Sequence, residues 1–159
     1  MARAIYIFCQ DDKTINFKDI AEFIKDGWHF DECPEFNIGE EDFIEIKYDP
    51  NLRPISIELF DDSQMVEEIK QESCEFYIDR IKSTSLIEQE LKNTIANKIK
   101  LTTNIYKIEF SWANLSEDCW NMMVSVETFL ANKKKGIILA DEGIYDENLQ
   151  LIINFQTSV

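Results

Sequence analysis

The sequence predicts an α+β domain in which helices pack on one face of a mainly antiparallel sheet. Apolar and polar residues alternate in residues 55–59 and 104–112, as they do in strands with one solvated face. Apolar residues recur at helical spacing in other segments, and the strands and helices do not alternate strictly along the chain. Strands and helices that do not alternate one by one favour an antiparallel sheet over a doubly wound parallel one.

In the N-terminal third we expect a strand, a helix, a long loop and a hairpin. Residues 4–9 are an apolar, β-prone run that is typical of a strand buried on both faces. Asn16 can cap a helix that Gly27 would end in a left-handed conformation. Residues 27–41 have no helical or strand period and predict a long loop, and residues 43–59 predict the hairpin.

Two helices are expected in the middle of the chain. Asp62 or Ser63 can cap the first of them, which should break near Ser83. Ser85 is followed three residues later by Glu88, which is the spacing of a capping box at the start of the second helix. A seam of apolar residues at intervals of four then continues to residue 99.

The last third predicts a strand, a helix and two further strands. Residues 104–112 form the strand, and Ser116 caps a helix that Gly136 stops. Residues 137–140 and 149–155 are apolar runs that predict two strands joined by a hairpin connection.

One carboxylate, Glu127, occupies an inward position of the helix that Ser116 begins. The other inward positions are apolar: Trp120, Met123, Val124, Leu130 and Ala131. Glu127 is therefore expected either to border the core or to be turned away from it.

The chain is expected to form a single domain over residues 1–159, because this length can bury one sizeable core. Both halves follow the order strand, helix, glycine and hairpin, which raises the hypothesis of a structural duplication. Residue identities do not repeat between the halves.

The charge of the chain excludes some classes of partner. It has 16 basic and 31 acidic residues, a net charge of −15, which repels phosphate backbones and anionic lipid headgroups. We therefore expect it to bind neither nucleic acid nor membranes. The N-terminal apolar stretch is too short for a signal peptide, and the four scattered cysteines suggest reduced thiols, so a cytoplasmic location is expected.

The sequence has no recognisable catalytic, metal or nucleotide motif, so we expect neither an enzyme nor a cofactor. The single histidine, His29, lies four residues before Cys33 and follows Trp28, which we expect to cover the edge of the core. An alternative interpretation is therefore a small enzyme or ligand-binding domain with a pocket near these three residues. A third is self-association through a sheet edge or helix face, and the oligomeric state stays open.

The leading interpretation is a non-catalytic domain that binds a basic protein through an acidic face. Residues 31–79 contain 16 acidic and 3 basic residues, and such a surface would steer a basic partner. In size, charge and α+β pattern the chain resembles bacterial immunity proteins, which cover basic toxin domains. The residues predicted to contact the partner are Glu40, Glu41, Asp42, Asp61, Asp62, Glu67 and Glu68.

Overall fold

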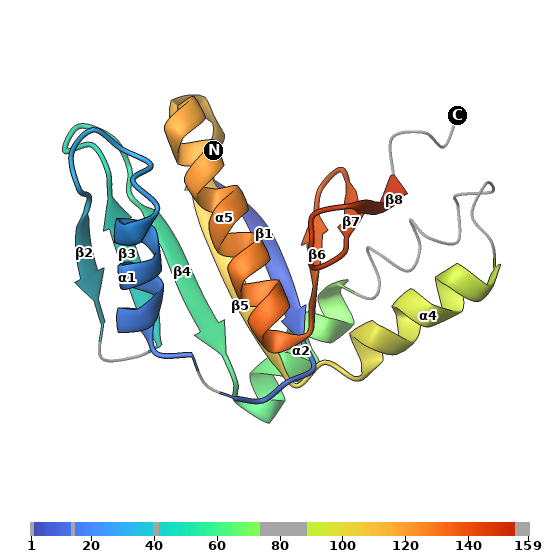
Figure 1. The fold of residues 1–159 in the computed structure, drawn as a ribbon. Helices are drawn as coiled ribbons and strands as arrows, with labels where there is room; N and C mark the ends of the chain where they lie inside the picture. Colours follow the sequence, from blue (N-terminus) through green and yellow to red (C-terminus); the bar gives the residue numbers. More distant parts are fainter. Residues whose placement is uncertain (1, 14, 40–41, 74–88, 155–159) are drawn as a thin grey trace.

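The computed structural model describes residues 2–13, 15–39, 42–73 and 89–154, and it confirms the α+β fold (Figure 1). All the described strands join one antiparallel sheet in the order β2-β3-β4-β5-β1-β6-β7-β8. The strands are β1 (Ala2–Cys9), β2 (Glu35–Ile38), β3 (Phe43–Lys47), β4 (Ile55–Phe60), β5 (Asn104–Ser111), β6 (Gly136–Ala140), β7 (Gly143–Tyr145) and β8 (Leu151–Asn154). The helices are α1 (Phe17–Asp26), α2 (Ser63–Ser73), α4 (Gln89–Lys100) and α5 (Glu117–Lys134), with a short 3-10 turn at Trp112–Asn114.

Strand β1 lies at the centre of the sheet, between β5 and β6. It pairs with β5 along its whole length, from Ala2 opposite Ser111 to Cys9 opposite Asn104. Both of its faces are buried, as the apolar run predicts, with Ile7 and Phe8 facing opposite sides. Since β5 and β6 both run antiparallel to β1, they are parallel to each other, and α5 crosses over β1 to connect them.

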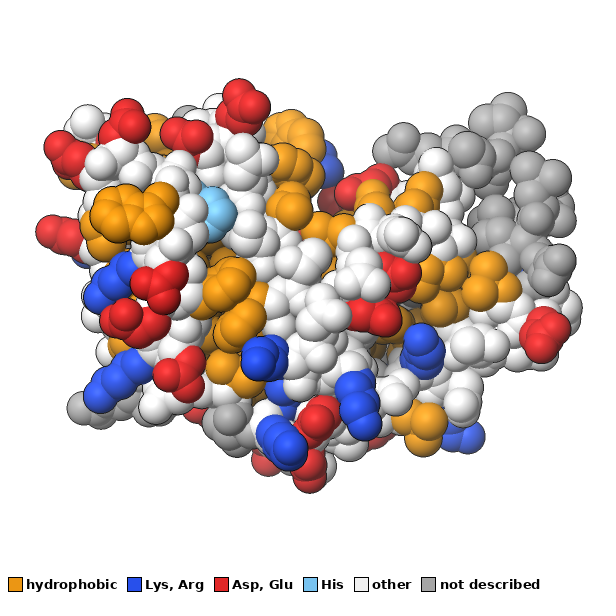
Figure 2. Space-filling model, viewed as in Figure 1, with side chains coloured by type: hydrophobic (Ala, Val, Ile, Leu, Met, Phe, Trp, Pro, Cys, Tyr) orange, Lys and Arg blue, Asp and Glu red, His pale blue; other side chains and the backbone are white. Residues whose placement is uncertain are grey.

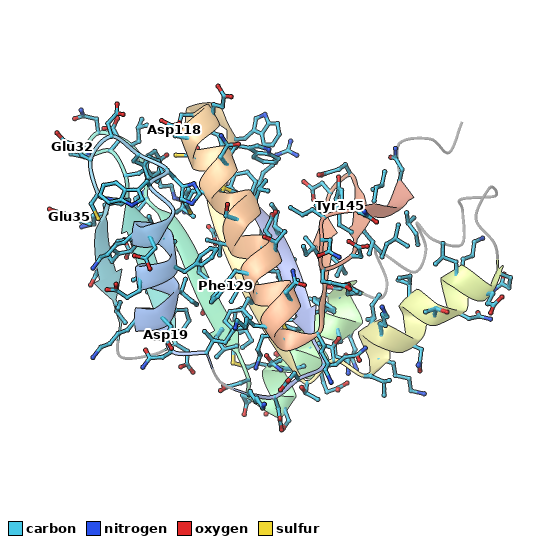
Figure 3. The ribbon with its side chains drawn as sticks, viewed as in Figure 1. Asp19, Glu32, Glu35, Asp118, Phe129 and Tyr145 are labelled. Carbon is cyan, nitrogen blue, oxygen red and sulfur yellow. The ribbon has the colours of Figure 1, made fainter. Side chains whose placement is uncertain are left out.

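Helices α1 and α5 cover one face of the sheet. Ile20 and Ile24 of α1 and Leu130 of α5 are buried in the larger hydrophobic cluster with that face. The two helices also contact each other, because the rings of Phe23 and Phe129 stack with 4.2 Å between their centroids. Figure 3 shows Phe129 on the side of α5 that faces α1.

Helices α2 and α4 contribute to a second cluster on the other face of the sheet. Val66 and Ile95 pack there with Phe8 and Leu139. The expectation that helices lie on one face therefore holds for α1 and α5 but not for α2 and α4. The reason is that β1 and β6 are apolar on both sides, so that this part of the sheet needs a helical layer on each face.

Two short strands were missed by the sequence analysis. Strand β2 lies inside the expected loop of residues 27–41, and β7 lies inside the connection expected between the last two strands. Three of the four β2 residues are exposed and β7 has three residues, so neither shows a usable alternation of apolar and polar side chains. Backbone pairing with a neighbouring strand defines both of them.

The ends of α1 and α5 differ from expectation in detail. Gly27 follows α1 with a right-handed φ of −78°, and the left-handed residue is Trp28, with φ 49°. Likewise Lys135, with φ 51°, ends α5 in a left-handed conformation, and Gly136 already belongs to β6. A Cβ atom at Gly136 would lie 3.0 Å from Ile7 Cγ2, so this glycine permits close packing against β1.

The two halves of the chain share an order of elements but follow different paths through the sheet. After α1 the strands run inward, from β2 at the edge to β4 beside β5. After α5 they run outward, from β6 beside β1 to β8 at the opposite edge. This difference in topology argues against a structural duplication.

Other expectations for the middle of the chain are met in part. Helix α2 begins at Ser63, as predicted, and α4 is described from Gln89. The expected break near Ser83 and the capping box of Ser85 and Glu88 lie outside the described residues.

Within the described part of the chain, no helix is long and apolar enough to cross a membrane.

A buried lysine connects α2 to the end of α4. Lys70 is 8% exposed, and its ammonium group donates hydrogen bonds to the backbone oxygens of Lys100 (2.6 Å) and Thr102 (3.2 Å). It also forms an ion pair with Glu67 at 3.0 Å. These carbonyl groups close the C-terminal end of α4, where a cation is favourable.

Replacing Lys70 with methionine should destabilise the domain by about 1 to 3 kcal/mol, because two backbone acceptors would lose their charged donor. Urea unfolding followed by circular dichroism measures this change. Lys100→Met is the matched control, since Lys100 is exposed and its substitution should change the free energy of unfolding by less than about 0.5 kcal/mol. Equal effects of the two substitutions would contradict the role assigned to Lys70.

Candidate functional site

The described acidic residues that the sequence predicts to bind a partner lie at one end of the sheet and at or after the start of α2. Asp42 and Asp61 lie at one end of the sheet, where the Leu59 amide donates to the Asp42 backbone oxygen at 2.9 Å. Asp62 immediately precedes α2, and its carboxylate accepts a hydrogen bond from the Met65 amide at 3.1 Å. Asp62 therefore has a structural role as a helix cap.

The remaining members of the predicted set lie on α2 or outside the described residues. Glu67 pairs with Lys70, and Glu68 accepts a hydrogen bond from Gln64 at 3.5 Å, both within α2. Glu40 and Glu41 lie outside the described residues. The set is thus divided between an end of the sheet and a helix on the face opposite α1 and α5.

The loop after α1 brings together the three residues of the alternative prediction. Trp28, His29 and Cys33 line one cavity of about 230 Å³. The other lining residues come from the end of α1 and the same loop: Glu22, Ile24, Lys25, Asp26, Phe30 and Pro34. The pocket predicted near these residues is therefore present.

The conformation of this loop depends on Gly27 and Phe30. His29 folds back over the end of α1, where a Cβ atom on Gly27 would collide with its imidazole ring. Phe30 stacks on Tyr48 with 5.9 Å between ring centroids, which connects the loop to the end of β3. The Cys33 thiol donates to the Pro34 oxygen at 3.6 Å, and no hydrogen bond joins it to His29 in the described structure.

Trp28 is the most exposed large hydrophobic residue in the described part of the chain, at 86% of its surface. The expectation that it covers the edge of the core was wrong, because its left-handed backbone turns the indole outward. Figure 2 shows hydrophobic side chains beside the pale blue histidine, with acidic side chains around them.

Exposed carboxylates are frequent in this loop and in the elements on either side of it. Helix α1, the loop and the first residue of β2 contain six of them: Asp19, Glu22, Asp26, Asp31, Glu32 and Glu35. The same stretch has two lysines, of which Lys25 pairs with Glu22 at 3.5 Å and lies 5.6 Å from the centroid of the Phe36 ring. Trp28, the cavity and five of these carboxylates are called the Trp28 surface below, because the sixth, Asp19, lies in the first turn of α1 at the end away from the loop (Figure 3).

A second cavity, of about 190 Å³, lies on the other side of α5, against β1, β6 and β7. Its apolar lining consists of Ile5, Trp120, Val124, Ile138, Ala140 and Leu149. Its polar lining consists of Glu127, Glu142 and Tyr145. Figure 3 shows Tyr145 across from α5, on the side away from Phe129. We call this space the Glu127 cavity.

The structure resolves the two alternatives for Glu127 in favour of burial. Glu127 is 4% exposed and lies on the inward side of α5. Burial, with a smaller contribution from the negative charge of Glu142, raises the pKa of the Glu127 carboxyl to about 8. At neutral pH this carboxyl therefore retains its proton in most molecules.

Glu142 and Tyr145 complete the polar side of the Glu127 cavity. The Tyr145 hydroxyl donates a hydrogen bond to Glu142 Oε1 at 3.1 Å. Burial, together with the Glu142 charge and this hydrogen bond, raises the pKa of Tyr145 to about 12. Glu142 lies in the two-residue connection between β6 and β7, so that its proximity to Glu127 depends on the pairing of these strands.

A buried thiol near the end of α5 is not a candidate nucleophile. Burial raises the pKa of Cys9 to about 12, although the neighbouring Lys134 opposes this effect. Lys134 is itself buried, which lowers its pKa. Cys9, Cys33 and Cys119 are free thiols, and the described residues contain no group of three or more His, Cys, Asp or Glu side chains that could hold a metal.

Comparisons with protein-family models, with curated proteins and with solved structures found no match to this chain. The functional argument therefore depends on the Trp28 surface and the Glu127 cavity themselves.

Replacing Glu127 with glutamine should make the stability of the domain less dependent on pH. Wild-type Glu127 has a pKa of about 8 in the folded state, above its usual 4.5. Between these values only the folded state binds the proton, so each pH unit lowers the free energy of unfolding by about 1.4 kcal/mol. Wild type should therefore lose more stability than the Gln variant as the pH rises from about 5 to about 8.

Urea unfolding of both proteins across this pH range measures the difference. Glu142 and Tyr145 also face Glu127, and they are present in both proteins. Asp118→Asn, an exposed change on the same helix, serves as the control and should follow the wild-type profile. Parallel profiles for wild type and the Gln variant would show that Glu127 ionises normally.

Proposed function

We propose that this chain is a non-catalytic binding domain that recognises a basic protein through the Trp28 surface. The observation that carries the proposal is an exposed tryptophan beside a cavity and within a group of carboxylates. Large aromatic side chains beside pockets are typical anchors of protein interfaces, and polar residues commonly form the surrounding rim. A lysine or arginine of the partner would meet both the carboxylates and the indole ring.

The charge of the chain supports this choice of partner. Six carboxylates and two lysines over α1, the loop and the start of β2 give this region a local excess of negative charge. The whole chain has a net charge of −15, which accelerates encounters with a basic protein at low ionic strength. Neutralisation of a basic protein, as in the immunity proteins that the chain resembles in class, is one role that such a surface could serve.

A second candidate function is the binding of a small molecule in the cavity of about 230 Å³ at the same place. The specific observation that favours it is that His29 and Cys33 both line this cavity with Trp28 and Phe30. A small ligand would contact these residues without contacting the outer carboxylates Asp31 and Glu32. Substitution of those carboxylates therefore distinguishes the two functions.

Capture of partners from a lysate of the source organism tests the proposed function. The purified chain is used as bait at about 0.05 and 0.5 M salt, and retained proteins are identified by mass spectrometry. We expect a basic protein that is retained at low salt and released at high salt. Trp28→Ala and the double variant Asp31→Asn/Glu32→Gln should each weaken its binding by about tenfold or more.

Two matched variants separate the Trp28 surface from the acidic residues predicted from the sequence. Glu67→Gln/Glu68→Gln removes the same number of charges from α2, and Asp42→Asn/Asp61→Asn removes them from the end of the sheet. Both should bind the partner within about twofold of wild type, since exposed charges far from an interface contribute little. Loss of binding in either control variant, together with unchanged binding of Trp28→Ala, would place the partner site at the substituted residues and contradict the proposal.

Alkylation of Cys33 provides an independent measure of occupancy. Cys33 is exposed and lines the cavity, whereas Cys9 and Cys119 are buried. A bound partner should slow the reaction of Cys33 with iodoacetamide, measured on the peptide that contains it, by about tenfold or more because the thiolate must be accessible to react. An unchanged rate in the saturated complex would contradict the proposed position of the interface.

A further inference from the structure

The Glu127 cavity combines an apolar wall with two carboxylates and includes no basic side chain among its lining residues. Carboxylates that are removed from water usually have a positive partner or several hydrogen-bond donors. Here Tyr145 donates to Glu142, which leaves the Glu127 carboxyl without a hydrogen bond or ion pair to another described residue. Glu127, at 4% exposed, thus lines the cavity with a carboxyl group that has no partner within the described part of the chain.

The basic side chain that pairs with Asp141, next to Glu142 in the sequence, already has partners. Arg3 forms an ion pair with Asp141 at 3.0 Å and lies over the Trp112 ring, 5.2 Å from its centroid. Asp141 immediately precedes Glu142, so the pair lies beside the cavity and does not line it. The chain therefore leaves Glu127 and Glu142 without a cation in the described structure.

We propose that the Glu127 cavity binds a small organic cation whose ammonium group lies between Glu127 and Glu142. The apolar body of the ligand would contact Ile5, Val124 and Ile138. Trp120 and Tyr145 also line the cavity, and aromatic faces attract cations. An aromatic or branched alkyl ammonium ion has an apolar body, which matches the apolar wall, and a positive charge, which matches the acidic side chains.

The size of the cavity limits the ligand to a small molecule. An apolar protein cavity of about 150 Å³ is large enough to hold benzene. The Glu127 cavity measures about 190 Å³, which is enough for a ring with a short aminomethyl group. Neither a nucleotide nor a folded peptide segment would fit inside it.

The chemistry favours a cation over a neutral molecule or an anion. An anion would be repelled by the charge of Glu142, and a purely apolar molecule would leave Glu127 unpaired. An ammonium group would stabilise the ionised form of Glu127 and offset its repulsion by Glu142. Binding should therefore release a proton at neutral pH, because Glu127 is protonated in the free protein.

Isothermal titration with benzylammonium tests this inference, and benzyl alcohol is the neutral control of nearly the same shape. We expect benzylammonium to bind at least about tenfold more tightly than the alcohol, as a charge-assisted contact requires. Its affinity should increase from about pH 6 to about pH 8, as the free Glu127 carboxyl loses its proton more readily. Heats measured in buffers of different ionisation enthalpy should report proton release near pH 7.

Substitutions locate the binding site. Glu127→Gln and Glu142→Gln should each weaken benzylammonium binding by about tenfold or more, and the first should abolish its pH dependence. Asp118→Asn, on the exposed part of α5, should bind as wild type does, and urea unfolding confirms that each variant is folded. Equal affinities for the amine and the alcohol, unchanged binding in Glu127→Gln, or no binding of benzylammonium to wild type would overturn the proposal.

Discussion

The burial of β1 on both faces is the constraint on which the rest of the structure depends. Its two neighbours, β5 and β6, come from the C-terminal part of the chain, so the sheet becomes continuous only when distant segments pair. The central strands also need a helical layer on each side, which α1 and α5 supply on one face and α2 and α4 on the other. Because α5 must cross over β1, one of its sides faces α1 and the other faces β7. The Trp28 surface lies on the α1 side, and the Glu127 cavity lies on the β7 side.

Local signals in the sequence predicted the elements that have a strong apolar pattern or a capping residue. Strand β1 and the β3–β4 hairpin were predicted within a few residues, and so were the starts of α1 and α5 at Asn16 and Ser116, whose side chains accept the expected hydrogen bonds. The short strands β2 and β7 were missed because pairing with a neighbour defines them, and pairing is not visible in a few residues. Which face of the sheet a helix covers is likewise a property of the assembled fold.

The candidate sites show the same division between local and long-range information. The closeness of His29 and Cys33 in sequence was enough to predict a shared pocket, and helical spacing identified Glu127 as an inward carboxylate. Glu142 and Tyr145 had no such signal, since the pairing of β6 with β7 brings them to Glu127. Charge counting along the sequence identified acidic residues at an end of the sheet and on α2, and their part in binding stays a prediction.

The location of the partner on the Trp28 surface is tested most directly by hydrogen–deuterium exchange of the chain, free and saturated with the captured basic protein. We predict slower amide exchange in the complex at the end of α1 and in the loop through residue 34, with exchange in α2 unchanged. Protection confined to α2 or to the residues between β4 and α2, with none around Trp28, would contradict the proposed recognition surface.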